Sequence, residues 1–255
     1  MTSHGFPSSD DALAIELAKT TGEMLLELRA EVGFDDPSAL RAAGDKRAHD
    51  LLVSELRLWR PADAVLSEEG GPDDGQRLAV PRVWIVDPLD GTREYAEEGR
   101  DDWAVHVALW QGGRLVTGAV ALPAQGVTLG RLTVDRHVGR PGRPIRIATS
   151  RTRPPSFLPA LAQQVGAQLV PMGSAGAKIV AVIRGEADAY IHAGGQYEWD
   201  SAAPVALAEA AGVHASRIDG SPLRYNQPDP SLPDLLVCHP VLTEELLAAL
   251  KECHA

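Results

Sequence analysis

The chain has 255 residues, which is enough to bury a sizeable core in one large domain or two ordinary ones. Its 24 basic and 35 acidic residues give a formal charge of −11, which argues against a basic surface for nucleic acid, and its two cysteines, Cys238 and Cys253, exclude a disulfide framework and a CxxC zinc site. The sequence has neither a signal-peptide pattern at its N-terminus nor a stretch approaching the roughly 20 apolar residues of a membrane span, so we expect a cytoplasmic protein without membrane or nucleic-acid partners.

Two helices are predicted first. Apolar residues recur at helical spacing over Asp10–Val32, and Ser9 or Asp10 can cap the start of this helix. The segment Phe34–Gly44 is predicted to be a loop, followed by a second helix over Asp45–Trp59. Asp45 would then begin that helix, where an ordinary N-cap is the simplest explanation of an aspartate.

The central feature of the sequence is the stretch VWIVDPLDGTREY, which starts with a β-branched apolar strand over Val83–Val86. The strand delivers two carboxylates, Asp87 and Asp90, three positions apart. Pro88 is expected to stop the strand, so that the chain folds back and directs both carboxylates and the carbonyl of Leu89 at one point. This arrangement predicts a cation site, although a strand followed by a turn would also explain the composition.

The residues around this motif could complete such a site. Gly91 lets the backbone approach a ligand closely, and a helix or turn beginning at Thr92 would present free N–H groups to an anion. Upstream, a short strand over Ala64–Ser67 runs directly into Glu68 and Glu69. Two adjacent acids are usually solvated, but a carboxylate at the end of a neighbouring strand would add a ligand.

The following segments complete the first half of the chain. Trp103–Trp110 and Arg114–Leu122 are predicted to form an antiparallel hairpin, and Thr128–Val134 to add a strand. The two N-terminal helices would cover one face of this antiparallel sheet, an α+β arrangement. His106, inside an alternating strand, is expected to pack in the core rather than bind a metal.

Arg136–Arg153 is rich in arginine, proline and glycine, which is typical of a connection between domains. The alternative is that Arg151 or a neighbour holds a second phosphate, because the guanidinium fork suits phosphate oxygens. We therefore expect an α+β metal-binding domain over residues 1–140 and an α/β domain over residues 141–255 that completes the active site.

Strands alternate with helices in the second half, which predicts a layered α/β part. The strands are expected over Arg146–Thr149, Gln168–Pro171, Ala187–His192 and Leu235–Cys238, and the helices over Ser156–Val165, Ser174–Arg184, Asp200–Ala211 and Thr243–Glu252. Asp200 begins one of these helices, where an N-cap again explains it. Only tertiary folding could bring Asp200 to Asp87.

Three motifs in this order resemble the magnesium-dependent, lithium-sensitive phosphatases of the inositol monophosphatase superfamily. Along the chain, they are DPLDGT at Asp87–Thr92, the segment with Gly173, Ser174, Ala175 and Lys178, and WDSAAP at Trp199–Pro204. The resemblance runs from about Asp45 to about Gly212 and implies a layered αβαβα sandwich. It departs from the superfamily in SALRAAGD, just before the Asp45 position, and at His192, where related nucleotidases tend to carry an arginine.

The resemblance implies a role for each candidate residue. Two or three Mg²⁺ ions would be held by Glu68, Asp87, Leu89, Asp90 and Asp200, with Asp87 bridging. Thr92, in hydrogen-bond reach of Asp45, would activate the attacking water with help from Glu68 and Glu69. The substrate contacts would be Glu68, Leu89, Asp90, Gly91, Thr92, Ser174, Glu198 and Asp200.

Two details resemble the 3'(2'),5'-bisphosphate nucleotidase branch: Arg93-Glu94-Tyr95 after the first motif, and Glu198 before the second. They imply removal of the 3'-phosphate of 3'-phosphoadenosine 5'-phosphate, a reaction of sulfate assimilation. Inositol 1-phosphate and fructose 1,6-bisphosphate remain alternative substrates. A magnesium-binding regulatory protein or a nucleotide-binding module without catalysis remains open, as does a homodimer.

Overall fold

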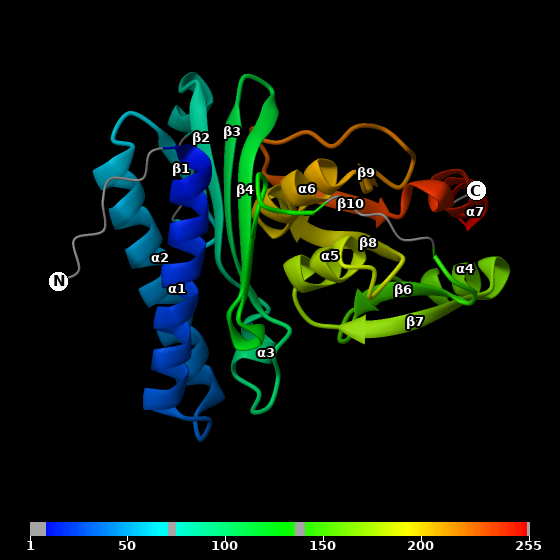
Figure 1. Ribbon diagram of the computed structural model, residues 1–255, viewed down its shortest axis with the longest axis horizontal. Helices are drawn as coiled ribbons and strands as arrows, with labels where there is room; N and C mark the ends of the chain where they lie inside the picture. The colour runs from blue at the N-terminus through cyan, green and yellow to red at the C-terminus, as the bar shows by residue number, and fades with distance from the viewer. Residues whose placement is uncertain (1–8, 71–74, 136–140, 254–255) are drawn as a thin grey trace.

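The computed structural model describes residues 9–70, 75–135 and 141–253. Its elements form five layers, in which two sheets alternate with three pairs of helices (Figure 1). From the N-terminal side, the order is α1 and α2, the first sheet, α5 and α6, the second sheet, and α4 and α7. The predicted αβαβα sandwich is confirmed.

The outer N-terminal layer consists of α1 (Asp10–Val32) and α2 (Pro37–Trp59). Ser9 caps α1 as predicted, because its side chain accepts a hydrogen bond from the Ala12 N–H. The start predicted for the second helix is wrong: Asp36 caps α2 by accepting from the N–H groups of residues 38 and 39, and Pro37 occupies its first turn. Asp45 therefore lies inside the helix rather than at its N-terminus.

Gly44, the last residue of the predicted loop, lies inside α2 and has a packing role there. A Cβ atom at this position would lie 2.8 Å from the Tyr95 ring and 2.9 Å from the Leu89 side chain. The missing side chain therefore lets α2 approach the end of the strand that carries the central acidic motif.

The first sheet has five strands in the order β1-β2-β3-β4-β5. They span Ala64–Ser67, Arg82–Asp90, Ala104–Gln111, Arg114–Leu122 and Val127–Gly130. The predicted β3–β4 hairpin is present. The sheet is mixed rather than purely antiparallel, because β1 pairs parallel with β2. Parallel pairing brings the ends of these two strands, and the acids that follow or occupy them, to the same edge.

The strand β2 does not stop at Pro88, contrary to the prediction. Asp87 pairs with His106 and Asp90 pairs with Ala104, with a register shift between the two pairs. Proline is tolerated in a strand at such a bulge, where the ladder hydrogen bond is already lost. The irregularity, rather than a strand end, therefore separates the two carboxylates.

The second sheet has the order β7-β6-β8-β10-β9. Its strands are β6 (Ile145–Ser150), β7 (Ala167–Met172), β8 (Ala189–Tyr197), β9 (His214–Ser216) and β10 (Ser231–Cys238), and its helices are α4 (Leu158–Val165), α5 (Ala175–Ile183), α6 (Glu198–Ala211) and α7 (Thr243–Cys253). The short β9 was not predicted, because three residues carry too little alternation to be recognised. The described helices include none long and apolar enough to cross a membrane.

Both faces of the first sheet are buried. Trp84 and Val86 pack with α1 and α2, whereas Val83 and Ile85 face a middle core that includes residues of α5, α6 and the second sheet. A third core lies between the second sheet and the α4–α7 pair. The middle core draws on both halves of the chain, and the domain boundary expected at residue 140 lies outside the described residues, so this division stays a prediction.

Candidate active site

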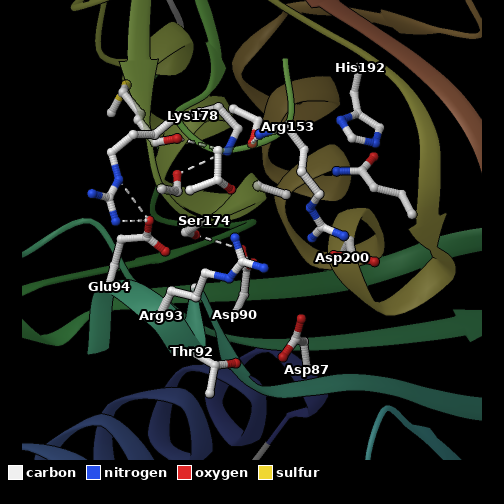
Figure 2. Close-up of a pocket in the computed structure, with 18 of the residues that line it drawn as sticks. Asp87, Asp90, Thr92, Arg93, Glu94, Arg153, Ser174, Lys178, His192 and Asp200 are labelled. Atoms are coloured by element: carbon white, nitrogen blue, oxygen red, sulfur yellow. Dashed lines mark hydrogen bonds and ion pairs between the residues drawn. The ribbon is translucent and has the colours of Figure 1, made fainter. Parts of the chain in front are cut away.

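A cavity of about 350 Å³ opens where the bulged end of β2 meets the beginnings of α5 and α6 (Figure 2). Its lining includes most of the candidate residues from both halves of the chain: Glu68, Asp87, Leu89, Asp90, Gly91, Thr92, Ser174 and Asp200. The tertiary meeting of Asp87 and Asp200, which the sequence could not establish, is present.

The carboxylates of the central motif are buried and held by hydrogen bonds. Asp87 Oδ1 accepts from the N–H of Leu89 at 3.1 Å, across the bulge. Asp90 Oδ2 accepts from Ser174 Oγ at 2.6 Å and from the Gly176 N–H at 2.8 Å. Burial raises the pKa of Asp87 well above its usual value, and the charges of neighbouring carboxylates act in the same direction.

Glu68 reaches the same cavity from the end of β1. By surface area Glu68 is exposed, but protein atoms crowd its carboxyl group and partly desolvate it. This desolvation, together with the charge of Asp90, raises the pKa of Glu68 to about 7. Glu68 thus lines the same cavity as Asp87 and Asp90, and its role as a metal ligand stays a prediction.

Asp200 lies in the first turn of α6, which begins at Glu198 rather than at Asp200. The predicted N-cap position is wrong: Tyr197 is the N-cap, and Asp200 is the third helical residue of a capping box, with its Oδ2 accepting from the Tyr197 N–H at 2.7 Å. Asp200 also lines the cavity. Burial and the charge of Asp90 raise the pKa of Asp200 to about 7. The helix dipole of α6 adds positive potential where this carboxylate lies.

These oxygen ligands fit a divalent cation. The charges of neighbouring carboxylates help to raise the pKa values of Glu68, Asp87 and Asp200, and a hard cation would relieve that repulsion. Oxygens of Asp87 and Asp90 and a ring nitrogen of His106 lie within 4.8 Å of one another. The donor set otherwise consists of oxygen atoms, which favours magnesium-like ions over zinc or copper.

His106 is fully buried, as expected for a core residue, but it also adjoins the carboxylates. Its Nδ1 lies 3.1 Å from the carbonyl oxygen of Trp199, and its Nε2 lies 3.3 Å from Asp90 Oδ2. The ring therefore connects the central motif of β2 to the residue before Asp200. No feature of the strand pattern indicated this contact.

Of Thr92, Asp45 and Glu69, the three residues expected to activate water, only Thr92 lines the cavity. Its hydroxyl donates to the Leu89 carbonyl at 3.2 Å. The described residues include no hydrogen bond between Thr92 and Asp45, contrary to the expectation. Asp45 and Glu69 are not part of the lining, although the charges of both act on Glu68. Burial, followed by the charge of Glu69, raises the pKa of Asp45 to about 6.

Two of the predicted substrate contacts have different surroundings. Ser174 lines the cavity and donates to Asp90. Glu198 is buried, and its carboxylate accepts from the N–H groups of Asn226 and Gln227 at 2.6 and 2.7 Å. Glu198 is not part of the lining. Its carboxylate instead holds the loop that contains Asn226 and Gln227 against the start of α6.

The opposite wall of the cavity is basic, which the sequence indicated only in part. Arg93, Arg151, Arg153 and Lys178 line it, together with His192 and the polar side chains of Tyr190 and Gln196 (Figure 2). The sequence suggests a phosphate contact for Arg151 or a neighbour, but it uses Arg93 only for the resemblance to the nucleotidase branch. The cluster of arginines within residues 136–153 is the sequence feature that indicates a basic region.

The comparisons with known proteins agree with this geometry. Residues 7–255 match the model of the inositol monophosphatase family. The 3'-phosphoadenosine 5'-phosphate phosphatase of Mycobacterium leprae is 53% identical over 96% of this chain and 94% of its own length. The 3'(2'),5'-bisphosphate nucleotidase CysQ of Escherichia coli K12 is 30% identical over 82% and 91%.

Among solved structures, CysQ from Bacteroides thetaiotaomicron superposes with a TM-score of 0.77 at 26% identity, covering 92% of this chain and 98% of that one. The superposition and the sequence matches extend across both sheets. The chain therefore belongs to the inositol monophosphatase family.

Proposed function

We propose that this chain is a metal-dependent phosphatase that hydrolyses the 3'-phosphate of 3'-phosphoadenosine 5'-phosphate to give adenosine 5'-phosphate and phosphate. The observation that carries the proposal is the convergence of Glu68, Asp87, Asp90 and Asp200 on the cavity that Thr92 also lines. The names of relatives at 53% and 54% identity support this substrate over inositol 1-phosphate or fructose 1,6-bisphosphate.

The four carboxylates and the Leu89 carbonyl would hold two or three Mg²⁺ ions. When bound, these ions supply positive charge that polarises the phosphoryl group and favours ionisation of the attacking water. Asp87 would be shared by the ions, which is consistent with the charges of Glu68, Asp90 and Asp200 all acting on it. Ser174 and the Gly176 N–H fix the orientation of Asp90, which would hold one of the ions.

The remaining chemistry belongs to side chains near the motif. Thr92 Oγ1 orients the attacking water, and Glu68, the acid beside it in the lining, assists in removing its proton. Asp45 and Glu69 lie outside the lining and act through Glu68, because their charges raise its pKa. The bond between phosphorus and the ribose 3'-oxygen breaks as the water oxygen bonds to phosphorus. Gly91 lines the cavity with a positive φ of 83°, a conformation that favours glycine, and a Cβ there would lie 3.2 Å from the Ser174 side chain.

The finer properties belong to the same proposal. We expect inhibition by lithium, a cytoplasmic location, and function either as a monomer or as a homodimer. The division into residues 1–140 and 141–255 would place the ligands Glu68, Asp87 and Asp90 in one part and Asp200 in the other.

Phosphate release tests the proposal directly. Wild type and Asp200→Asn are compared on 3'-phosphoadenosine 5'-phosphate, inositol 1-phosphate and fructose 1,6-bisphosphate, with Mg²⁺ and with EDTA. We expect wild type to favour the nucleotide, to require Mg²⁺, and to lose at least about 10³-fold in rate in the variant. Preference for another substrate would refute the nucleotide assignment, and no release from any of the three would leave a regulatory or nucleotide-binding protein.

A further inference from the structure

The basic wall of the cavity contains two kinds of cation. Lys178 and Arg151 are already paired: Lys178 Nζ donates to the Gly173 carbonyl at 3.0 Å, and Arg151 forms ion pairs with Glu94 at 3.0 Å and Glu97 at 2.7 Å. Arg93 and Arg153 differ, because neither guanidinium group has a hydrogen bond or ion pair to any residue in the described part of the chain. The remaining arginine of the lining, Arg41, lies in α2, where its charge acts on the carboxyl group of Asp45. Both belong to the lining and extend into the cavity in Figure 2.

These two arginines come from different parts of the fold. Arg93 lies in α3 (Thr92–Tyr95), directly after the central motif, and Arg153 lies in the loop after β6. The ion pair of Arg151 with the buried carboxylate of Glu94 ties that loop to α3. Arg151 thereby holds the two free guanidinium groups on facing elements of one cavity.

The electrostatics of this wall favour an anion other than the reacting phosphate. Burial lowers the pKa of His192, and the charges of Lys178 and Arg153 lower it further, which reports positive potential there. Two divalent ions would only neutralise the four carboxylates opposite. A phosphomonoester carries a charge of about −1.5 to −2 at pH 7, so a substrate with two such groups needs cations beyond the metal site.

We infer that Arg93 and Arg153 together bind the substrate phosphate that is not hydrolysed, and that this pair makes the enzyme select bisphosphates over monophosphates. The inference rests on the proposed function. It identifies the 5'-phosphate as the part of the substrate that lies against the basic wall. The guanidinium forks donate to the oxygens of the 5'-phosphate while the 3'-phosphate lies at the carboxylates. They are specificity residues, because they contact a part of the substrate remote from the bond that breaks.

The test compares two substrates that differ by one phosphate, 3'-phosphoadenosine 5'-phosphate and adenosine 3'-phosphate. The Mg²⁺-loaded proteins are wild type, Arg93→Ala, Arg153→Ala and the double variant, with Arg114→Ala as matched control at the exposed first residue of β4. Each single variant is expected to lower the ratio of kcat/KM for the bisphosphate to that for the monophosphate by about 10- to 100-fold, mainly through KM. Arg93→Lys and Arg153→Lys should recover part of the ratio, because lysine keeps the charge without the fork.

Equal losses on both substrates would overturn the inference, since they would show that the arginines act on the reacting phosphate or on folding. An unchanged ratio would overturn it as well.

Binding separates this inference from the proposed activity. Calorimetry measures Kd for adenosine 5'-phosphate and for adenosine in the same Mg²⁺-loaded proteins. If adenosine 5'-phosphate binds more tightly than adenosine, and this difference is lost in the double variant but kept in Arg114→Ala, the phosphate site is supported. Such a result would support the site even if wild type hydrolysed neither substrate, which would refute only the proposed activity. Equal affinity of wild type for the two ligands would overturn the inference even if hydrolysis were found.

Discussion

The hydroxyl of Ser174 donates a 2.6 Å hydrogen bond to Asp90 Oδ2, although the two residues are 84 positions apart in the sequence. Ser174 also accepts from the Ala177 N–H and so caps α5, with a positive φ of 46°. One side chain thus joins the start of a helix in the second half to a carboxylate in the first. The orientation of Asp90 depends on how the two halves pack.

Replacing this hydroxyl should weaken both the fold and the site. Ser174→Ala is expected to lower the free energy of unfolding by about 1–3 kcal/mol, because α5 loses its cap and Asp90 a donor. We expect kcat/KM to fall by about 10-fold, corresponding to about 1.4 kcal/mol in the barrier. Ser54→Ala, which removes only an exposed bond to Leu51, is the control. Full activity of Ser174→Ala would contradict a positioning role.

The metal-free protein should be destabilised by its own acidic cluster. The folded-state pKa of Asp87 is raised, so its ionisation opposes folding, and this penalty grows as pH rises above the unfolded value of about 3.9. In EDTA at pH 8, Asp87→Asn is expected to melt higher than wild type, by about 2–4 °C for each kcal/mol of repulsion removed. The difference should shrink towards pH 5.

Asparagine keeps the oxygen that accepts from the Leu89 N–H, so geometry is conserved in this variant. Mg²⁺ should stabilise wild type more than Asp87→Asn, and the variant should be inactive. Asp101→Asn, at an exposed position, should melt as wild type does. A metal-free Asp87→Asn protein that melts lower than metal-free wild type at pH 8 would exclude this account of the cluster.

A separate ion network predicts sensitivity to acid. Asp10 pairs with Arg60 at 2.7 Å and with Arg82 at 2.9 Å. Burial alone would raise the pKa of Asp10, but the hydrogen bonds from both arginines outweigh it and lower the pKa. The resulting stabilisation is present above the unfolded pKa of about 3.9 and is lost as pH falls through the lower folded value.

Asp10→Asn should therefore be less stable than wild type at pH 7, by about 1 kcal/mol after allowance for solvent screening, and the gap should close below about pH 3. Guanidinium unfolding at pH 7 and urea unfolding at pH 3 measure the two differences. A gap that is constant over this range would show that lost packing, rather than charge, causes the effect.

The close approach of α5 to His106 predicts an unusual result for a glycine in a helix. Alanine normally stabilises a helix by about 1 kcal/mol relative to glycine. At Gly176, however, an added Cβ would lie 2.0 Å from His106 Nε2. Gly176→Ala should therefore destabilise the protein by about 1–3 kcal/mol and reduce activity, since the displaced ring presses on Asp90.

Gly142→Ala is the matched control, because a Cβ there meets nothing within 4 Å. Its melting temperature should change little. If Gly176→Ala melted at or above the wild-type temperature, the contact between α5 and His106 would not constrain the site.

The acidic residues of the site could be predicted because they follow local patterns. A β-branched run ending in Asp87 and Asp90, and a short strand ending in Glu68, both produced the expected neighbours at one sheet edge. The layered architecture followed from the alternation of strands and helices. Asp200 reached the same cavity only through tertiary packing, and the resemblance, rather than periodicity, indicated it.

The errors came from proline and glycine. Pro88 suggested a strand end, but the bulge between Asp87 and Asp90 absorbs it. The predicted loop ended at Gly44, but this residue lies inside α2, where its missing side chain leaves room for Tyr95 and Leu89. In both cases the local preference of the residue was overridden by contacts between elements that the chain order does not reveal. The hydrogen bonds of the Glu198 carboxylate to the backbone of residues 226 and 227 could not be predicted from the sequence for the same reason.

The shared middle core has a consequence for synthesis of the protein. The first sheet is complete at Gly130, yet its inner face, with Val83 and Ile85, is covered by α6, which ends at Ala211. A nascent chain therefore exposes an apolar sheet surface until about 80 more residues have been translated, for several seconds or longer at ribosomal rates of about 5–20 residues per second. In a cell, mutations on the inner faces of α5 and α6 would therefore first increase aggregation of the nascent chain during this interval, before any effect on unfolding of the finished protein.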